Sequence, residues 1–188
     1  YGVDAVRYFA LREVPFGSDG NFSEEALVTR TNSDLANVLG NLVNRTVAMS
    51  NKYFKGKIRN VNSYDEDNDF VSCINSLKDK YMVKMDKYEV NEALILIFDV
   101  LRRSNKYVDE TTPWILFKEG KLERLESVLY NLLEAVRVCS ILLQPFIPSS
   151  CEKIFKQLGV SDAFFSSIDN KSDFSVNKQE VLFQRIVS

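Results

Sequence analysis

Apolar residues recur every three or four positions over most of this 188-residue chain. The spacing is clearest between Lys87 and Tyr107 and between Leu122 and Leu143, and it is that of one face of an α-helix. The chain has only seven glycines and four prolines, too few for a loop-rich β sandwich. These features predict an all-α fold, an antiparallel helix bundle with one apolar core.

Capping residues and helix breakers give the expected boundaries of a helical lead-in and about five main helices. Ser23, followed by Glu24 and Glu25, predicts a helix start. The connection before it, 14–21, is rich in turn residues, and the tail is polar before an apolar end that we expect to pack on the bundle. The expected helices are 2–13, 33–54, 67–84, 87–107, 122–143 and 148–158.

Composition excludes several kinds of chemistry. Without any histidine, neither a Ser-His-Asp nor a Cys-His arrangement is possible. The three cysteines, Cys73, Cys139 and Cys151, are far apart and do not form a zinc-binding pattern. No glycine-rich phosphate loop is present. We therefore expect no catalytic residue, no metal and no cofactor in this chain.

The expected setting is cytoplasmic, without a membrane partner. The most apolar stretch, Ala93–Leu101, is interrupted by Asp99 and is much shorter than the roughly 20 residues of a membrane span. The start resembles neither a signal peptide nor a native amino terminus, because a helical pattern begins at once. We expect the chain to be part of a longer protein. A net charge of −2 argues against a general polyanion binder.

One helix carries an unusual polar face. At about 100° per residue, one side of the 33–54 helix combines Asp34, Asn37, Asn41, Asn44 and Arg45. Such a face is most often simply solvated, but asparagine is a poor helix former, so three of them suggest another use. Asn41 and Arg45 stand about 6 Å apart along the axis. Together they complement a base edge with acceptors and one donor, such as that of cytosine.

Trp114 is the only tryptophan and follows Pro113 in a polar connection expected over 108–113. A lone tryptophan is more often a core residue, but an exposed one stacks on unpaired bases. Two further charged groups are candidates for a role in binding or in helix capping. Arg102, Arg103 and Lys106 either meet phosphates or complement a helix dipole. The acidic run 65–67 is expected to be a solvated loop that caps the next helix.

A set of short motifs, in this order and spacing, resembles the carboxy-terminal part of the bacterial methionyl-tRNA synthetases, a family of class I aminoacyl-tRNA synthetases. The resemblance covers nearly the whole chain. Its motifs are Gly2-Val-Asp-Ala-Val-Arg-Tyr-Phe9, Arg12-Glu-Val-Pro-Phe-Gly-Ser-Asp-Gly20, Phe22-Ser-Glu-Glu-Ala26, Asn41-Leu-Val-Asn-Arg45, Pro113-Trp114, Gln144-Pro-Phe-Ile-Pro148 and Leu182-Phe-Gln-Arg-Ile186.

The resemblance implies a helix-bundle domain that binds the anticodon loop of tRNA(Met), with anticodon CAU. Asn41 and Arg45 match positions that contact the first anticodon base, Trp114 the aromatic that stacks on the anticodon, and Pro113 the residue that shapes its loop. It also implies three parts. These are a linker with tRNA stem contacts (1–22), the anticodon-binding bundle (23–168) and a tail that packs back on it (169–188).

The chain departs from the family pattern in lacking the catalytic domain with its His-Ile-Gly-His and Lys-Met-Ser-Lys-Ser motifs. Methionine and ATP (with Mg) are therefore expected to bind only that missing domain of the full-length enzyme. Gln184 stands where the family often has proline. Two alternatives stay open at this point. One is the equivalent domain of another class I synthetase, and the other is a structural or protein-interaction bundle with Trp114 buried.

Overall fold

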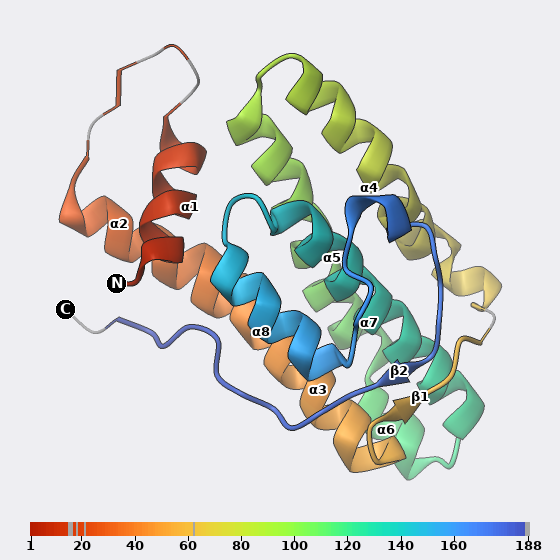
Figure 1. The fold of residues 1–188 in the computed structure, drawn as a ribbon. Coiled ribbons are helices and arrows are strands. Elements are labelled where there is room, and N and C mark those ends of the chain that lie inside the picture. The colour runs from red at the N-terminus through yellow and green to blue at the C-terminus, as the bar shows by residue number, and fades with distance from the viewer. Residues whose placement is uncertain (15–16, 18, 21, 62, 187–188) are drawn as a thin grey trace.

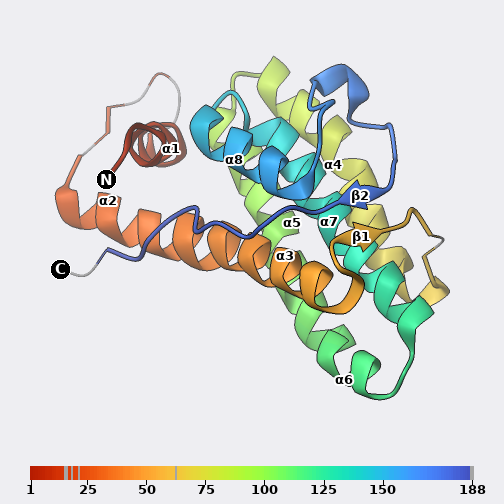
Figure 2. The ribbon, with the colours of Figure 1, turned by 60° about the horizontal axis from the view of Figure 1, so that its bottom comes forward.

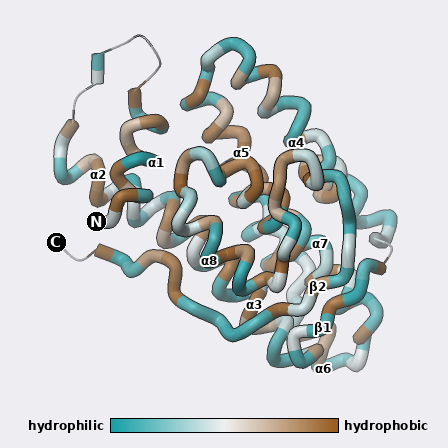
Figure 3. Tube along the Cα trace, in the orientation of Figure 1, coloured by the Kyte–Doolittle hydropathy of each residue, from teal (hydrophilic) through white to brown (hydrophobic). Residues whose placement is uncertain are grey.

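Helices dominate the structure. The computed structural model describes residues 1–14, 17, 19–20, 22–61 and 63–186, and half of the connection expected over 14–21 lies outside them. In this described part, helices pack around one apolar core, and the only β structure is a two-stranded ribbon (Figure 1). Apolar and polar segments alternate along the helices in Figure 3, as amphipathic helices require. The prediction of an all-α bundle is confirmed.

Helix α7 (Leu122–Leu143) is the centre of the bundle. Every side chain from Leu125 to Leu143 is buried, not only one face of the helix. A helix buried all round has to be covered by other elements. Its neighbours include α4 (Asn68–Asp86), α5 (Val90–Thr111) and α8 (Pro148–Leu158). Two charges in it, Glu134 and Arg137, pair with each other at 2.7 Å, which makes their burial tolerable.

Residues 24–54 form one continuous helical rod rather than two helices. The rod consists of α2 (Glu24–Arg30), the π-helical η1 (Thr31–Gly40) and α3 (Asn41–Phe54) (Figure 2). It begins at Ser23, whose side chain accepts a hydrogen bond from the backbone N–H of Ala26 at 3.1 Å. The expectation of a new helix start at residue 33 is wrong, because the backbone stays helical there.

Helix α1 (Val3–Glu13) is fastened to the start of α8. The carboxylate of Asp4 accepts hydrogen bonds from the backbone N–H and the hydroxyl of Ser150, at 2.6 and 2.7 Å. Arg7 donates to the carbonyl oxygens of Pro145 and Phe146. A carboxylate at a helix N-terminus satisfies free backbone N–H groups and interacts favourably with the helix dipole. These contacts hold α1 against the bundle.

The tail returns along the rod. Strand β2 (Phe174–Ser175) pairs antiparallel with β1 (Lys57–Ile58), which follows the end of α3. Gly56 makes this approach possible, since it has a positive φ of 77° and a Cβ there would lie 2.4 Å from the carbonyl oxygen of Val176. Two short 3₁₀ turns, η2 (Asp65–Asp67) and η3 (Phe165–Ser167), complete the connections.

Among the described helices, none is both long enough and apolar enough to cross a membrane.

Candidate nucleic-acid interface

Asn41 and Arg45 occupy the first turns of α3. Asn41 is exposed, and the side chain of Arg45 is 31% exposed. The Arg45 guanidinium donates from Nη2 to Oδ1 of Asp109 on α5, at 3.0 Å. This ion pair fixes the direction of the guanidinium and ties the middle of the rod to the last turns of α5.

Trp114 lies in a short helix that the sequence did not suggest. Helix α6 (Pro113–Lys118) has Pro113 at its first position, where a missing N–H is harmless, and Thr112 before it has a positive φ of 44°. Pro113 is buried, whereas Trp114 is 45% exposed. The expected polar connection over 108–113 is therefore wrong, because α5 continues to Thr111. The alternative with Trp114 in the core is wrong as well.

The structure brings Arg45 and the Trp114 segment to one side of the molecule. Asp109, the partner of Arg45, lies only five residues before Trp114, and Figure 2 shows α6 beside the C-terminal end of α3. Asn41 is one helical turn from Arg45 on the same face. An exposed amide, a guanidinium and an indole thus share one surface. Sequence reasoning missed Asp109, because it lies in the segment expected to be a polar connection.

The side chains expected on one polar face of the rod lie in different environments in the structure. Asp34 is buried and accepts a hydrogen bond from the Tyr8 hydroxyl at 2.7 Å, so it is not part of a solvated face. Burial and this carboxylate raise the pKa of Tyr8. Asn44 accepts a hydrogen bond from Gln179 of the tail. Of the five residues of this face, only Asn37 and Asn41 are exposed.

The tail completes a hollow beside Asn41. This hollow of about 540 Å³ is lined on the rod by Asn37, Asn41 and Asn44, and on the tail by Phe183 and Arg185 among others. The backbone of Ile186 is held by Asn32, whose side chain both donates to its carbonyl and accepts from its N–H, each at 2.9 Å. The tail is thus positioned along the face that carries Asn41.

The three cations before Trp114 are already paired. Arg102 contacts Asp99 at 2.9 Å and Asp34 at 3.4 Å. Arg103 contacts Glu110 at 2.9 Å, and Lys106 contacts the same carboxylate at 3.4 Å. Their charges are therefore largely balanced within the protein, which argues against a dedicated phosphate site at these positions.

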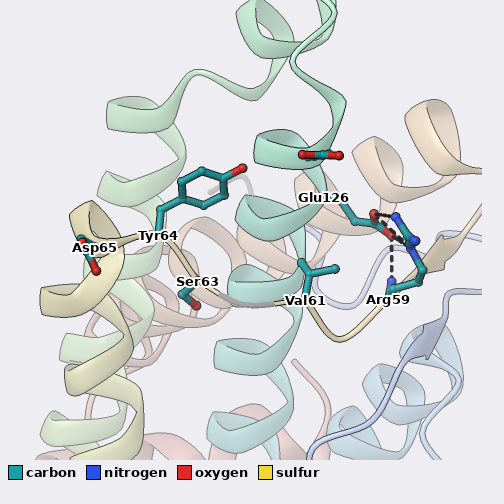
Figure 4. Close-up of a pocket in the computed structure, with 7 residues that line it drawn as sticks. Arg59, Val61, Ser63, Tyr64, Asp65 and Glu126 are labelled. Atoms are coloured by element: carbon teal, nitrogen blue, oxygen red, sulfur yellow. Dashed lines mark hydrogen bonds and ion pairs between the residues drawn. The ribbon is translucent and has the colours of Figure 1, made fainter.

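A second hollow, of about 530 Å³, lies over the connection between β1 and η2. Figure 4 shows the hydrogen bonds between Arg59 and Glu126 at its edge. Arg59 donates from its backbone N–H and its guanidinium to the Glu126 carboxylate, at 2.6 to 3.2 Å. These hydrogen bonds lower the pKa of Glu126. Because the two charges satisfy each other, this contact anchors β1 on α7.

The acidic run at 65–67 is not simply solvated, because Asp67 is 1% exposed. Its carboxylate accepts two hydrogen bonds from Arg124, at 2.7 and 2.8 Å, and one from the Tyr107 hydroxyl at 2.7 Å. Asn131 also donates to it at 3.3 Å. Burial is the main reason that the pKa of Tyr107 is raised. The network joins η2 to α5 and α7.

In the described residues, no group of three or more His, Cys, Asp or Glu side chains is arranged to hold a metal ion.

A helical bundle that exposes an amide, a guanidinium and an indole on one side fits the RNA-binding part of a class I tRNA synthetase. Residues 1–47 match a family described as tRNA synthetases class I (M). Residues 59–186 match the anticodon binding domain of methionyl tRNA ligase, and the chain belongs to this family. The resemblance drawn from the sequence motifs is confirmed.

Curated relatives agree with this assignment. The chain is 49% identical over 193 residues to the methionine–tRNA ligase of Caldanaerobacter subterraneus subsp. tengcongensis, a match that covers 99% of this chain and 30% of the relative. It is 45% identical over 195 residues to that of Bacillus subtilis, covering 99% of this chain and 29% of the relative. The chain thus spans less than a third of these relatives.

Solved structures show the same fold. The apo form of the Mycobacterium tuberculosis methionyl-tRNA synthetase has a TM-score of 0.93 and 36% identity, covering 100% of this chain and 39% of that one. The same enzyme in complex with methionyl-adenylate has a TM-score of 0.92 and 36% identity, and the match covers 98% of this chain and 38% of that one.

Proposed function

We propose that this chain is the part of a methionine–tRNA ligase that reads the CAU anticodon of tRNA(Met). The observation that carries the proposal is that Asn41 and Trp114 are exposed and Arg45 partly so, with Arg45 tied through Asp109 to the segment that presents Trp114. Membership of the anticodon-binding family supports it. Without a bound base, much of the apolar surface of the Trp114 indole stays exposed to water.

Each of these side chains has a separate role in the proposal. Asn41 offers a donor and an acceptor and Arg45 offers donors, which together match the edge of the first anticodon base, cytosine. A wrong base leaves donors unpaired, at a cost of about 1–3 kcal/mol per group. Trp114 stacks on an unpaired base, and Pro113 fixes the first turn of the helix that presents it.

The proposal extends to the longer protein. That protein would attach methionine to tRNA with ATP and Mg, and both small substrates would bind outside this chain. Residues 1–22 would contact the inner side of the tRNA, 23–168 would bind the anticodon loop, and 169–188 would brace the bundle. We place the enzyme in the cytoplasm, without a membrane partner.

The test uses Trp114 as the only indole reporter. Its emission is followed while a CAU anticodon stem-loop is added, and in parallel a loop with a changed first anticodon base. We expect quenching and tighter binding with the CAU loop, and loss of this preference in Asn41→Ala and Arg45→Ala. Asn75→Ala, an exposed asparagine on α4, is the matched control.

Equal binding of both loops by the unaltered chain would contradict the proposal. A preference for the anticodon loop of another tRNA would instead assign the chain to a different specificity. With a net charge of −2, we expect a dissociation constant that is micromolar or weaker.

A further inference from the structure

A second aromatic surface lies next to Trp114. Tyr53, in the last turn of α3, and Phe117, in α6, stack with ring centroids 4.4 Å apart and an angle of 24° between the rings. Phe117 is 45% exposed, the same fraction as Trp114. Because Trp114 and Phe117 are three residues apart on a helix, they are neighbours on its surface. The exposed rings of Trp114 and Phe117 and the partly buried ring of Tyr53 therefore form a strip from Trp114 to Tyr53.

This strip continues the face of α3 that bears Arg45. Lys52 is seven residues beyond Arg45, two helical turns further on the same face, and Tyr53 follows it directly. At a rise of about 1.5 Å per residue, the step from Arg45 to Tyr53 is about 12 Å along the axis. The aromatic pair thus lies further along the same surface, where a strand that leaves the Asn41–Arg45 site can continue.

Two lysines, Lys52 and Lys118, adjoin the aromatic pair. The Lys52 ammonium lies 5.5 Å from the centroid of the Tyr53 ring. Lys118 directly follows Phe117 and is exposed. Within the part of the chain that the structure describes, neither lysine takes part in an ion pair, in contrast to Arg102, Arg103 and Lys106. Aromatic rings next to unpaired lysines are a combination found in sites that bind single-stranded nucleic acid.

We propose that Tyr53 and Phe117 form a second stacking platform for the RNA. An unpaired loop base next to the one held by Asn41 and Arg45 would stack there, with its phosphate near Lys52 and Lys118. The inference rests on the proposed function, because it extends the same RNA surface. Continuity with that surface and the positive charge favour a nucleotide as the occupant. Stacking accepts any base, so the platform adds affinity rather than sequence preference.

The test measures binding of a fluorescently labelled CAU stem-loop by anisotropy, with the full 188-residue chain. We expect Phe117→Ala to weaken binding about tenfold, since base stacking on one ring is worth this much. Phe117→Leu keeps apolar contact with Tyr53 but has no flat ring, so it should unfold at nearly the same temperature and still bind about tenfold more weakly. Phe164→Ala is the matched control, because Phe164 is 70% exposed in the connection after α8.

A loop with abasic sites on either side of the first anticodon base identifies the occupant. If the platform holds a neighbouring base, one of these sites weakens binding by the unaltered chain but has little further effect on Phe117→Leu. Independent, additive losses would overturn the platform. Substituting Lys52 and Lys118 with glutamine should also lower the dependence of binding on salt, because fewer counterions are released.

The two proposals fail in different ways. If Phe117→Leu binds like the unaltered chain while Asn41→Ala loses the CAU preference, the platform is wrong and anticodon reading stands. If the unaltered chain binds both loops equally but Phe117→Leu weakens both, the platform stands and anticodon reading is wrong. If no stem-loop binds at millimolar concentration, both are overturned.

Discussion

The Arg45 guanidinium lies 3.0 Å from the carboxylate of Asp109, although the two residues are 64 positions apart in the chain. The contact joins α3 to the end of α5 and so links the face that carries Asn41 to the segment that presents Trp114. Asp109 is 67% exposed, so the pair adds little to stability. Its consequence is the direction in which Arg45 points.

Removing the ion pair that orients Arg45 should reduce base selectivity more than it reduces the free energy of unfolding. In Asp109→Asn the attraction between the two charges is lost, and ordering the less firmly held Arg45 side chain on binding costs about 1 kcal/mol. We expect the preference for the CAU loop over a loop with a changed first base to fall about fivefold, with unfolding shifted by less than about 0.5 kcal/mol. Asp99→Asn, which removes one of the two carboxylate partners of Arg102 instead, should leave the preference unchanged. Unaltered selectivity in Asp109→Asn would show that the ion pair is incidental.

The buried Asp67 carboxylate should be essential for stability. Asp67→Ala leaves Arg124, whose side chain is 14% exposed, without its buried partner. Breaking a buried pair in this way costs about 3–5 kcal/mol, measured as the free energy of unfolding in denaturant. Asp65→Ala, an exposed position in the same turn, should change it by less than about 0.5 kcal/mol. Similar values for the two variants would rule out the network as a main stabilising contact.

Tyr8→Phe tests the link between α1 and η1. Tyr8 is 0% exposed, and its hydroxyl donates to the buried Asp34 carboxylate. A hydrogen bond to a charged group contributes about 1.5–3 kcal/mol, so unfolding should require about that much less free energy. In Tyr81→Phe the loss should be small, because no hydrogen bond of the Tyr81 hydroxyl is seen among the described residues. Equal losses in the two variants would contradict this role of Tyr8.

The Arg59–Glu126 contact predicts a specific pH dependence. The hydrogen bonds from Arg59 lower the pKa of Glu126 below its ordinary value of 4.5, so folding favours the charged carboxylate. The resulting stabilisation is fully present above the ordinary pKa and is lost as the pH falls through the lower, folded-state pKa. The free energy of unfolding of Glu126→Gln should therefore approach that of the unaltered chain only in acid. A difference that stays constant down to that range would contradict the assignment.

The three thiols should differ in reactivity. Cys139 and Cys151 are 0% exposed, and burial raises the pKa of both. Cys73, on α4, is only partly buried. Because the thiolate is the reactive form, an alkylating reagent at mildly alkaline pH should modify Cys73 in the folded chain and the other two only after unfolding. Mass spectrometry of peptides checks this, and early labelling of Cys139 would show local opening of α7.

Several parts of the fold follow from neighbouring residues alone. The apolar period predicted the helix from Leu122 to Leu143, and Pro148 and Gly159 predicted the limits of α8. The same reasoning failed at residues 32–34, where capping side chains are present but the rod continues. There Asp34 accepts a hydrogen bond from Tyr8, and Asn32 donates one to the tail. The side chains that suggested a helix start are therefore used in tertiary contacts.

The sequence by itself determined the helical class, the spacing of Asn41 and Arg45 and the presence of Pro113 before Trp114, because these depend on residues close together in the chain. Only the tertiary structure decided that Trp114 is exposed, that Asp67 is buried and that Arg45 meets Asp109. These outcomes depend on how separate helices pack, and a local pattern holds no information on which distant side chain will lie opposite.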